Sequence, residues 1–165
     1  FDEGVSIGPL VNEAALEKVD RQVKDALGKG ATLVSGGRRL TENGLDRGFF
    51  YAPTILSHVT PHMAIYREET FGPVAPVVVY DNEKELLDLA NDTHYGLASY
   101  VYTEKLSTAI RYFEGLQFGI IGINDINPTA ASAPFGGMKE SGLGREGASE
   151  GIFEYLETKL GGFAI

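Results

Sequence analysis

The chain has 165 residues, 43% of them apolar and 22% charged, so it is long enough to form one globular domain with a hydrophobic core. Its 14 basic and 23 acidic residues leave a net charge of −9, which argues against nucleic acid or an anionic membrane as a partner. It contains no cysteine, no apolar run of membrane-spanning length and no signal peptide pattern. We therefore expect neither a disulfide scaffold nor a membrane protein, and a cytoplasmic location.

In the first half of the chain, apolar residues at helical spacing predict an amphipathic helix over residues 13–27. Asn12 can cap this helix and Gly28 can stop it. Its buried stripe is expected at Leu16, Val19, Val23 and Leu27. Short strands are predicted at 31–34 and 49–56, with an exposed polar loop between them and Pro53 favouring an edge strand or a bulge.

From residue 74 to 124, strand and helix patterns alternate, which favours parallel strands joined by helical crossovers. The expected strands are 74–80, 97–102 and 118–124, and the expected helices are 82–91 and 104–116. The helices should bury Leu86, Leu87 and Ala90, and Leu106, Ile110 and Phe113. A long loop, a short helix near 149–155 and a final strand near 157–165 follow. We predict an α/β fold whose mostly parallel sheet has helices on both faces.

Residues 66–80 are the stretch around which the rest of the chain is organised. They begin with a pair of carboxylates, Glu68 and Glu69, turn at a Phe-Gly-Pro corner and end in a valine-rich run typical of a strand buried on both faces. Because open α/β sheets bind ligands at strand ends, a carboxylate and an aromatic held at this corner could contact a ligand. Residue type alone favours a simpler interpretation, a capped strand start with a buried phenylalanine.

The glycines at 142, 144 and 147 satisfy the G-x-G-x-x-G pattern of dinucleotide-binding loops. That loop must follow an apolar strand, and residues 138–141 do not read as one. We therefore interpret these glycines as residues of tight turns with positive φ. The three histidines share no metal-ligand spacing, and no G-x-S-x-G nucleophile motif is present, so we predict no metal site.

Two segments carry a family resemblance. Residues 68–74, Glu-Glu-Thr-Phe-Gly-Pro-Val, resemble the Glu-Glu-x-Phe-Gly-Pro motif of the NAD(P)-dependent aldehyde dehydrogenases. Residues 134–146 are similar to that family's Pro-Phe-Gly-Gly-x-Lys-x-Ser-Gly-x-Gly-Arg-Glu segment. The resemblance covers the whole chain and implies that it corresponds to the C-terminal part of a family member. A first residue other than methionine fits this expectation.

The resemblance implies a role for five residues. The second glutamate of the first motif, Glu69, would hydrogen-bond the ribose hydroxyls of the nicotinamide, and Phe71 would pack by the nicotinamide end of NAD or NADP. Phe135 would line the aldehyde pocket. The loop at 124–133, which contains Thr129 and Ser132, would border the substrate tunnel.

The family mechanism uses a cysteine thiolate, a glutamate-activated water and an oxyanion hole. The resemblance places these residues upstream of this chain, so no catalytic residue is assigned here and the chain alone is expected to be inactive. It further implies a partial catalytic domain at 1–155, an oligomerisation strand at 156–165 and a homo-oligomer, either a dimer or a tetramer.

Among subfamilies, residues 141–147 and 155–159 look most like succinate-semialdehyde dehydrogenases. Those enzymes often carry a carboxylate-binding serine four residues before the Pro of Pro-Phe-Gly-Gly. That position is Ala130 here, with Ser132 nearby, so the identity of the aldehyde substrate stays open. A free-standing, non-catalytic α/β binding or assembly module is the alternative.

Overall fold

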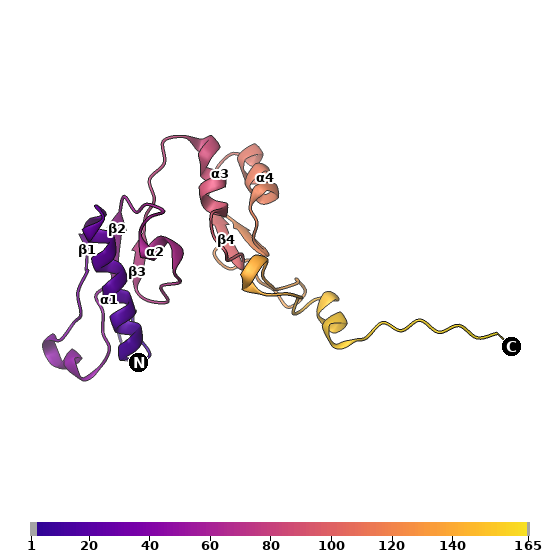
Figure 1. Cartoon of the computed structure of the whole chain (residues 1–165), viewed down its shortest axis with the longest axis horizontal. Coiled ribbons are helices and arrows are strands. Elements are labelled where there is room, and N and C mark those ends of the chain that lie inside the picture. The colour runs from indigo at the N-terminus through magenta and orange to yellow at the C-terminus, as the bar shows by residue number, and fades with distance from the viewer. Residues whose placement is uncertain (1–2, 165) are drawn as a thin grey trace. The chain divides into compact units, whose positions relative to one another are not determined.

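The computed structural model describes residues 3–164. They form two compact units, and the boundary between the units along the chain lies between Asp81 and Asn82. Each unit combines helices with a small sheet (Figure 1). The elements of the first unit are α1 (Glu13–Gly28), β1 (Thr32–Ser35), a 3₁₀ helix (Glu42–Arg47), β2 (Thr54–Ser57), α2 (Ala64–Arg67) and β3 (Val74–Pro76). The expected helix and the first two strands are therefore present, although the second strand is shorter than predicted.

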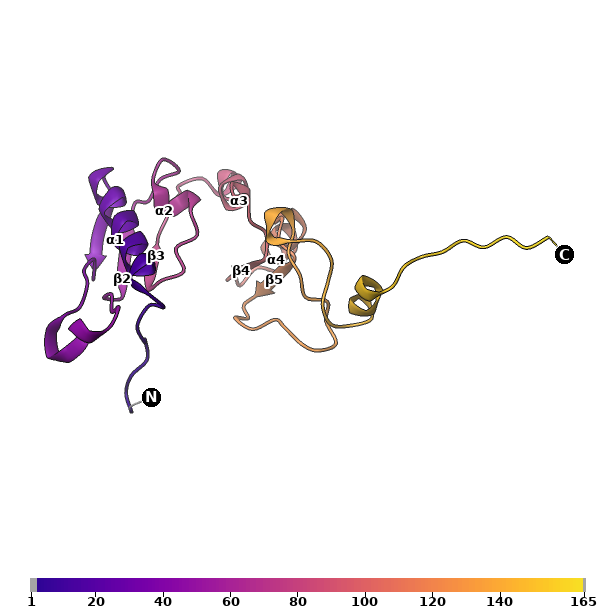
Figure 2. The same ribbon diagram turned by 60° about the horizontal axis from the view of Figure 1, so that its bottom comes forward.

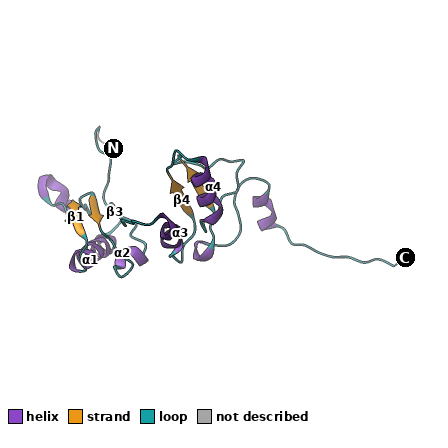
Figure 3. Cartoon of the chain, turned by 90° about the horizontal axis from the view of Figure 1, so that it is seen from above, coloured by secondary structure: helices purple, strands orange, loops and turns teal. Residues whose placement is uncertain are grey.

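The sheet of the first unit has the strand order β1-β2-β3. β1 pairs antiparallel with β2, and β2 pairs parallel with β3, so that Leu56 lies opposite both Leu33 and Pro76. Helices α1 and α2 lie on the same side of this sheet (Figure 3). One face of the sheet is thus covered by helices, and Leu33 and Ile55 remain exposed.

Helix α1 forms because its sequence is amphipathic and capped as predicted. The Asn12 side chain accepts a hydrogen bond from the Ala15 amide at 2.9 Å, which satisfies one of the free N–H groups of the first turn. Leu16, Val19 and Val23 are buried, and Leu27 is packed against the same core. The core also contains Leu56, Val59, Met63 and Ile65. The stripe predicted from sequence is confirmed.

The valine-rich run differs from its prediction. Only Val74–Pro76 is a strand, and Val77, Val79 and Tyr80 are exposed. β3 pairs with β2 on one side, and in the described part of the chain nothing pairs with its other edge. The composition predicted a strand buried on both faces. Such burial needs a layer of structure on each face of the sheet, and within residues 3–164 helices α1 and α2 cover only one face (Figure 3).

The second unit contains α3 (Glu83–Asn91), β4 (Ala98–Val101), α4 (Leu106–Gly115), β5 (Ile120–Ile123) and two 3₁₀ helices (Lys139–Ser141 and Glu150–Tyr155). β4 and β5 pair in parallel, with α4 packed against β5 (Figure 2). The Asn82 side chain caps α3 by accepting from the Lys84 amide at 3.0 Å. The strand–helix–strand crossover predicted for this region is therefore confirmed.

Two expectations about the second half are corrected, and a third, the final strand, is not seen in the described residues. Strand β3 belongs to the sheet of the first unit, so residues 3–164 form two small sheets in place of one sheet with helices on both faces. The apolar residues of α4, Leu106, Ile110 and Phe113, are 49–75% exposed. Residues 156–164 form no strand and continue as an extended segment after Tyr155 (Figure 1), and Ile165 lies outside the described residues. The apolar residues of α4 and of the segment after Tyr155 are therefore left without a covering surface in the described chain.

Candidate functional site

The first candidate site is the short loop of Glu69, Thr70 and Phe71, which connects α2 to β3. The loop is held at both ends by contacts to the first unit. Its N-terminal end is Glu68, the residue after α2, whose amide donates to the Ala64 carbonyl at 2.8 Å. Its C-terminal end is Gly72, which leads into β3.

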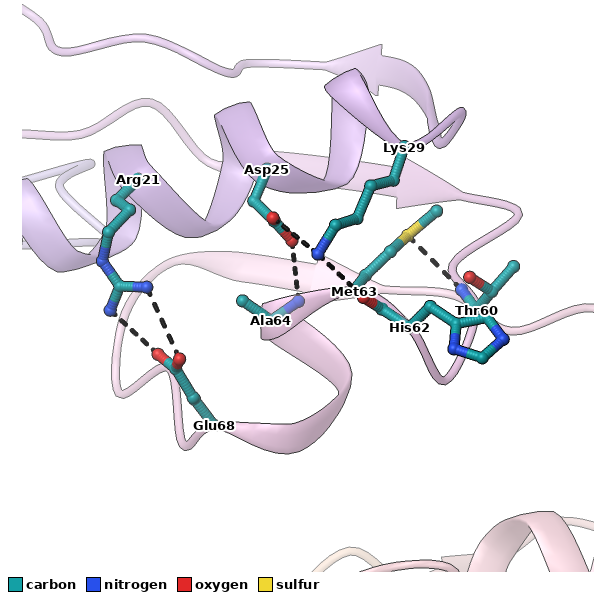
Figure 4. Close-up of polar contacts among 8 residues, drawn as sticks. All are labelled: Arg21, Asp25, Lys29, Thr60, His62, Met63, Ala64 and Glu68. Atoms are coloured by element: carbon teal, nitrogen blue, oxygen red, sulfur yellow. Dashed lines mark hydrogen bonds and ion pairs between the residues drawn. The ribbon is translucent and has the colours of Figure 1, made fainter.

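At the N-terminal end, the Glu68 carboxylate reaches back to helix α1 (Figure 4). Arg21 donates through one guanidinium nitrogen to Glu68 Oε2 at 2.9 Å and through the other to Oε1 at 3.5 Å. The side-chain amide of Gln22, a residue that is fully buried, donates to Glu68 Oε2 at 3.4 Å. The hydrogen bond from Arg21 lowers the pKa of Glu68, so the carboxylate is charged at neutral pH.

The same face of α1 also holds the start of α2 (Figure 4). Asp25 Oδ2 accepts from the Ala64 amide at 2.7 Å, while its other oxygen lies 2.7 Å from Lys29 Nζ. That ammonium also donates to the carbonyl of His62 at 2.8 Å. Two hydrogen bonds lower the pKa of Asp25. The bond from the Ala64 backbone amide has the larger effect, and the bond from the Lys29 side chain comes second. Because Met63 offers no side-chain cap, Asp25 caps α2 from another helix.

At the C-terminal end, close packing fixes the loop. A Cβ on Gly72 would lie 2.6 Å from Val19 Cγ2, so only glycine allows the backbone to approach α1 this closely. The Pro73 carbonyl accepts from the Thr54 amide at 2.8 Å, which joins the corner to β2. The Phe-Gly-Pro corner is therefore a rigid junction.

Between these two anchors, the loop presents two side chains to solvent. Phe71 is 82% exposed and has φ of 46°, a left-handed conformation that is unusual for a bulky residue. Glu69 is exposed and, within residues 3–164, its carboxylate makes no hydrogen bond or ion pair. The simpler prediction of a buried phenylalanine is wrong. A free carboxylate beside an exposed aromatic ring, on a strained and anchored backbone, is an arrangement suited to binding a ligand.

The second candidate site is in the second unit, where the two ends of the 134–146 segment pair with each other. Phe135 and Glu146 form an antiparallel bridge with two backbone hydrogen bonds of 2.8 and 2.7 Å. The Arg145 guanidinium spans the turn between them, donating to the carbonyls of Gly137 at 2.9 Å and Gly144 at 2.7 Å. The segment is thus a closed loop.

This loop is docked on the segment between α3 and β4. The Gly96 carbonyl accepts from both Gly119 and Met138, at 2.9 and 2.8 Å. The Gly96 amide donates to Ser141 Oγ at 2.9 Å. Lys139 donates to the carbonyls of Asn91 and Thr93 at the C-terminus of α3, both at 2.9 Å, where the helix dipole favours a cation.

Phe135 lies at an open cleft of about 740 Å³. The cleft is also lined by Leu97, Leu143, Arg145, Glu154 and Tyr155. Thr129 and Ser132 are exposed in the preceding loop, and the lining found within residues 3–164 includes neither. Thr129 donates instead to Asn127 Oδ1 at 2.9 Å. The structure therefore places Phe135, and not these two hydroxyls, at the cleft.

The glycine-rich stretch confirms the prediction of turns. Gly142, Gly144 and Gly147 all have positive φ, between 69° and 121°, and a 3₁₀ helix precedes them. Gly142 and Gly144 belong to the closed loop described above, Gly147 directly follows it, and within residues 3–164 no strand leads into them. The described residues contain no cluster of three side chains placed to bind a metal ion. Among the helices of residues 3–164, none combines the length and the apolar character that crossing a membrane requires.

Comparison with known proteins identifies the family. Residues 1–160 match the sequence profile of the Aldehyde dehydrogenase family. The chain belongs to this family.

Individual relatives agree with this assignment. The chain is 48% identical over 159 residues to a mitochondrial succinate-semialdehyde dehydrogenase of Mus musculus, covering 96% of this chain and 30% of that protein. It is 45% identical over 164 residues to a 3-sulfolactaldehyde dehydrogenase of Pseudomonas putida, covering 98% and 33%. A betaine aldehyde dehydrogenase of Staphylococcus aureus in complex with NAD+ is similar in structure, with a TM-score of 0.89, 39% identity and coverage of 96% and 32%. The chain therefore spans about a third of the length of these aldehyde dehydrogenases.

Within this aldehyde dehydrogenase chain, sequence reasoning missed the residues that hold the motifs in place. Arg21 and Asp25 of α1 and its C-cap residue Lys29 are spaced four residues apart, which puts them on one side of the helix. That spacing was visible in the sequence, but it does not show that α2 lies against this face. In the sequence, Arg145 and Lys139 are recognisable only as letters of the second motif. In the structure, Arg145 closes the second loop and Lys139 docks it, each through backbone carbonyls.

Proposed function

We propose that the chain acts as the C-terminal part of an NAD(P)-dependent aldehyde dehydrogenase, which oxidises an aldehyde to a carboxylic acid. The observation that carries this proposal is the loop at 69–71, whose free carboxylate and exposed ring stand on a backbone anchored at both ends. Membership of the family supports the aldehyde dehydrogenase part of this proposal.

In this proposal, the Glu69 carboxylate accepts hydrogen bonds from the ribose hydroxyls next to the nicotinamide. Phe71 packs by the nicotinamide end of the cofactor, where its exposed ring offers an apolar surface. A nicotinamide cofactor is supported by a similar structure, that of a Staphylococcus aureus betaine aldehyde dehydrogenase in complex with NAD+. When bound, the cofactor would accept a hydride. The cofactor is NAD or NADP.

For the substrate, we propose an aldehyde that carries an anionic group, with succinate semialdehyde as the first candidate. Relatives named succinate-semialdehyde dehydrogenase and 3-sulfolactaldehyde dehydrogenase support this class. Phe135 would line the aldehyde pocket, and Thr129 and Ser132 would border it from the preceding loop. A cytoplasmic location stays a prediction, and the name of the mouse relative places that protein in mitochondria.

The test is Glu69→Gln in an enzyme of family length that carries this chain. The amide keeps one acceptor but loses the charge-assisted bonds to the ribose hydroxyls, so hydride transfer should slow about tenfold. Steady-state and single-turnover formation of NADH from succinate semialdehyde measures this. The melting temperature should stay unchanged, because Glu69 is exposed and has no partner among the described residues.

The matched control is Glu17→Gln, the same chemical change at an exposed position of α1. It should leave both rate and stability unchanged. Wild-type kinetics in the Glu69 variant would refute the cofactor role of Glu69, whereas a family-length protein that forms no NADH at all would favour a non-catalytic binding or assembly module.

We further propose that the chain self-associates. The segment after Tyr155 carries Leu160 and Phe163, both more than 90% exposed, and the apolar face of α4 is exposed as well. Burying such surface stabilises by about 25 cal/mol per Å², while the repulsion from a net charge of −9 is screened beyond about 8 Å. Light scattering should show dimers or larger species that decrease when residues 156–165 are removed. A monomer at millimolar concentration would contradict this proposal.

A further inference from the structure

We propose that Arg21 is a positioning residue for the cofactor-contacting loop and acts on Glu69 and Phe71 through its hydrogen bonds to Glu68. This inference rests on the proposed function. It assigns to α1, a helix outside both motifs, a part in binding the nicotinamide cofactor.

The first step is the geometry of the contact between the Arg21 and Glu68 side chains, which we call the clamp. The planar guanidinium of Arg21 meets both oxygens of the Glu68 carboxylate, at 2.9 and 3.5 Å (Figure 4). A two-point contact fixes the rotation of the carboxylate as well as its distance, which one ammonium group cannot do. The buried amide of Gln22 adds a third donor from the adjacent position of α1.

The second step is the short distance along the chain from the clamp to the residues proposed to contact the cofactor, Glu69 and Phe71. Glu68 and Glu69 are consecutive, so a rotation of the Glu68 backbone moves the next side chain directly. Helix α2 has only four residues, too few to hold its own C-terminal end, because an isolated turn is unstable in water. The direction of the chain leaving α2 is therefore set by contacts to α1.

The third step separates positioning from general stabilisation. The side chains of Arg21 and Glu68 are 56% and 47% exposed, and exposed ion pairs contribute little to the free energy of unfolding. The core beneath them is formed by other residues. Loss of the clamp should therefore loosen the loop at 69–71 without unfolding the unit.

The first arm of the test uses the 165-residue chain and backbone ¹⁵N relaxation. In Arg21→Gln, the order parameters of the amides at 69–71 should fall from about 0.85 to below about 0.6, while those of β2 stay unchanged. Lys24→Gln is the control, because Lys24 makes an exposed ion pair with Asp20 on the same helix. The exchanged pair Arg21→Glu with Glu68→Arg should restore order. Unchanged order parameters in Arg21→Gln would overturn the inference.

The second arm uses an enzyme of family length that carries this chain, with NAD+ and succinate semialdehyde. Arg21→Gln should raise the KM for NAD+ about two- to fivefold and leave the KM for the aldehyde unchanged. If Glu69→Gln impairs the enzyme and Arg21→Gln does not, the inference fails and the proposed function stands. If neither variant changes the kinetics, the proposed function itself fails, and the relaxation data alone decide whether Arg21 orders the loop.

Discussion

The 165-residue chain should form no NADH or NADPH when it is mixed with NAD+ or NADP+ and succinate semialdehyde. Aldehyde oxidation by the mechanism that the family resemblance implies begins with attack of a thiolate on the aldehyde carbon, and this chain has no cysteine. Neither candidate site offers a substitute. The Glu69 carboxylate stands alone in its loop, and the lining of the cleft beside Phe135 in the described chain contains hydroxyl, carboxylate and guanidinium groups but no activated nucleophile.

The measurement is absorbance at 340 nm over hours at high protein concentration, with several aldehydes. A heat-inactivated sample sets the background, and an enzyme of family length that carries this chain is the positive control. Turnover above background by the 165-residue chain would contradict the prediction and would require a nucleophile other than cysteine.

Replacing Gly119 by alanine should destabilise the second unit by about 2–3 kcal/mol and release the loop that carries Phe135. A Cβ at this position would overlap the Gly136 carbonyl oxygen, a backbone atom that no side-chain rotation can move away. The backbone near Gly119 must therefore shift, which weakens the two hydrogen bonds that the Gly96 carbonyl accepts. Phe135, the residue before Gly136, would then lose its position at the cleft.

Urea unfolding followed by the amide resonance of Met138 measures this effect, because that amide reports the docking of the loop. The control is Gly28→Ala, where an added Cβ meets nothing within 4 Å and φ is ordinary for an L-residue. The control should leave the urea midpoint of Met138 unchanged. A Gly119→Ala chain that unfolds at the wild-type urea concentration would show that the loop is not docked as described.

Local elements were predictable because their causes lie within a few residues. The helix at 13–28 follows from its apolar period and its Asn12 cap, and the cap of α3 at Asn82 follows from the same rule. The turns at Gly142, Gly144 and Gly147 follow from the conformational freedom of glycine. The parallel pairing of β4 and β5 follows from the helix between them.

Pairing and burial were not predictable to the same degree, because they depend on what lies opposite a segment. The run at 74–80 has the composition of a buried strand, yet only its first three residues form a strand, and Val77 and Val79 are exposed. The apolar face of α4 has the spacing of a buried stripe, but no element within residues 3–164 covers Leu106. Periodicity shows which side of an element is apolar and does not supply the surface that buries it.

The candidate sites likewise have features that the sequence determined and features that only the tertiary structure decided. The sequence alone determined the family resemblance and the three motif residues Glu69, Phe71 and Phe135, since these are read directly from residue order. Only the tertiary structure placed Phe71 in a left-handed, exposed conformation and brought Arg21 to Glu68, 47 residues along the chain. It also put Phe135 at the cleft and left Thr129 and Ser132 outside it. The physical reason is that a hydrogen bond between distant residues depends on how two elements pack, and that packing is set by the buried core as a whole.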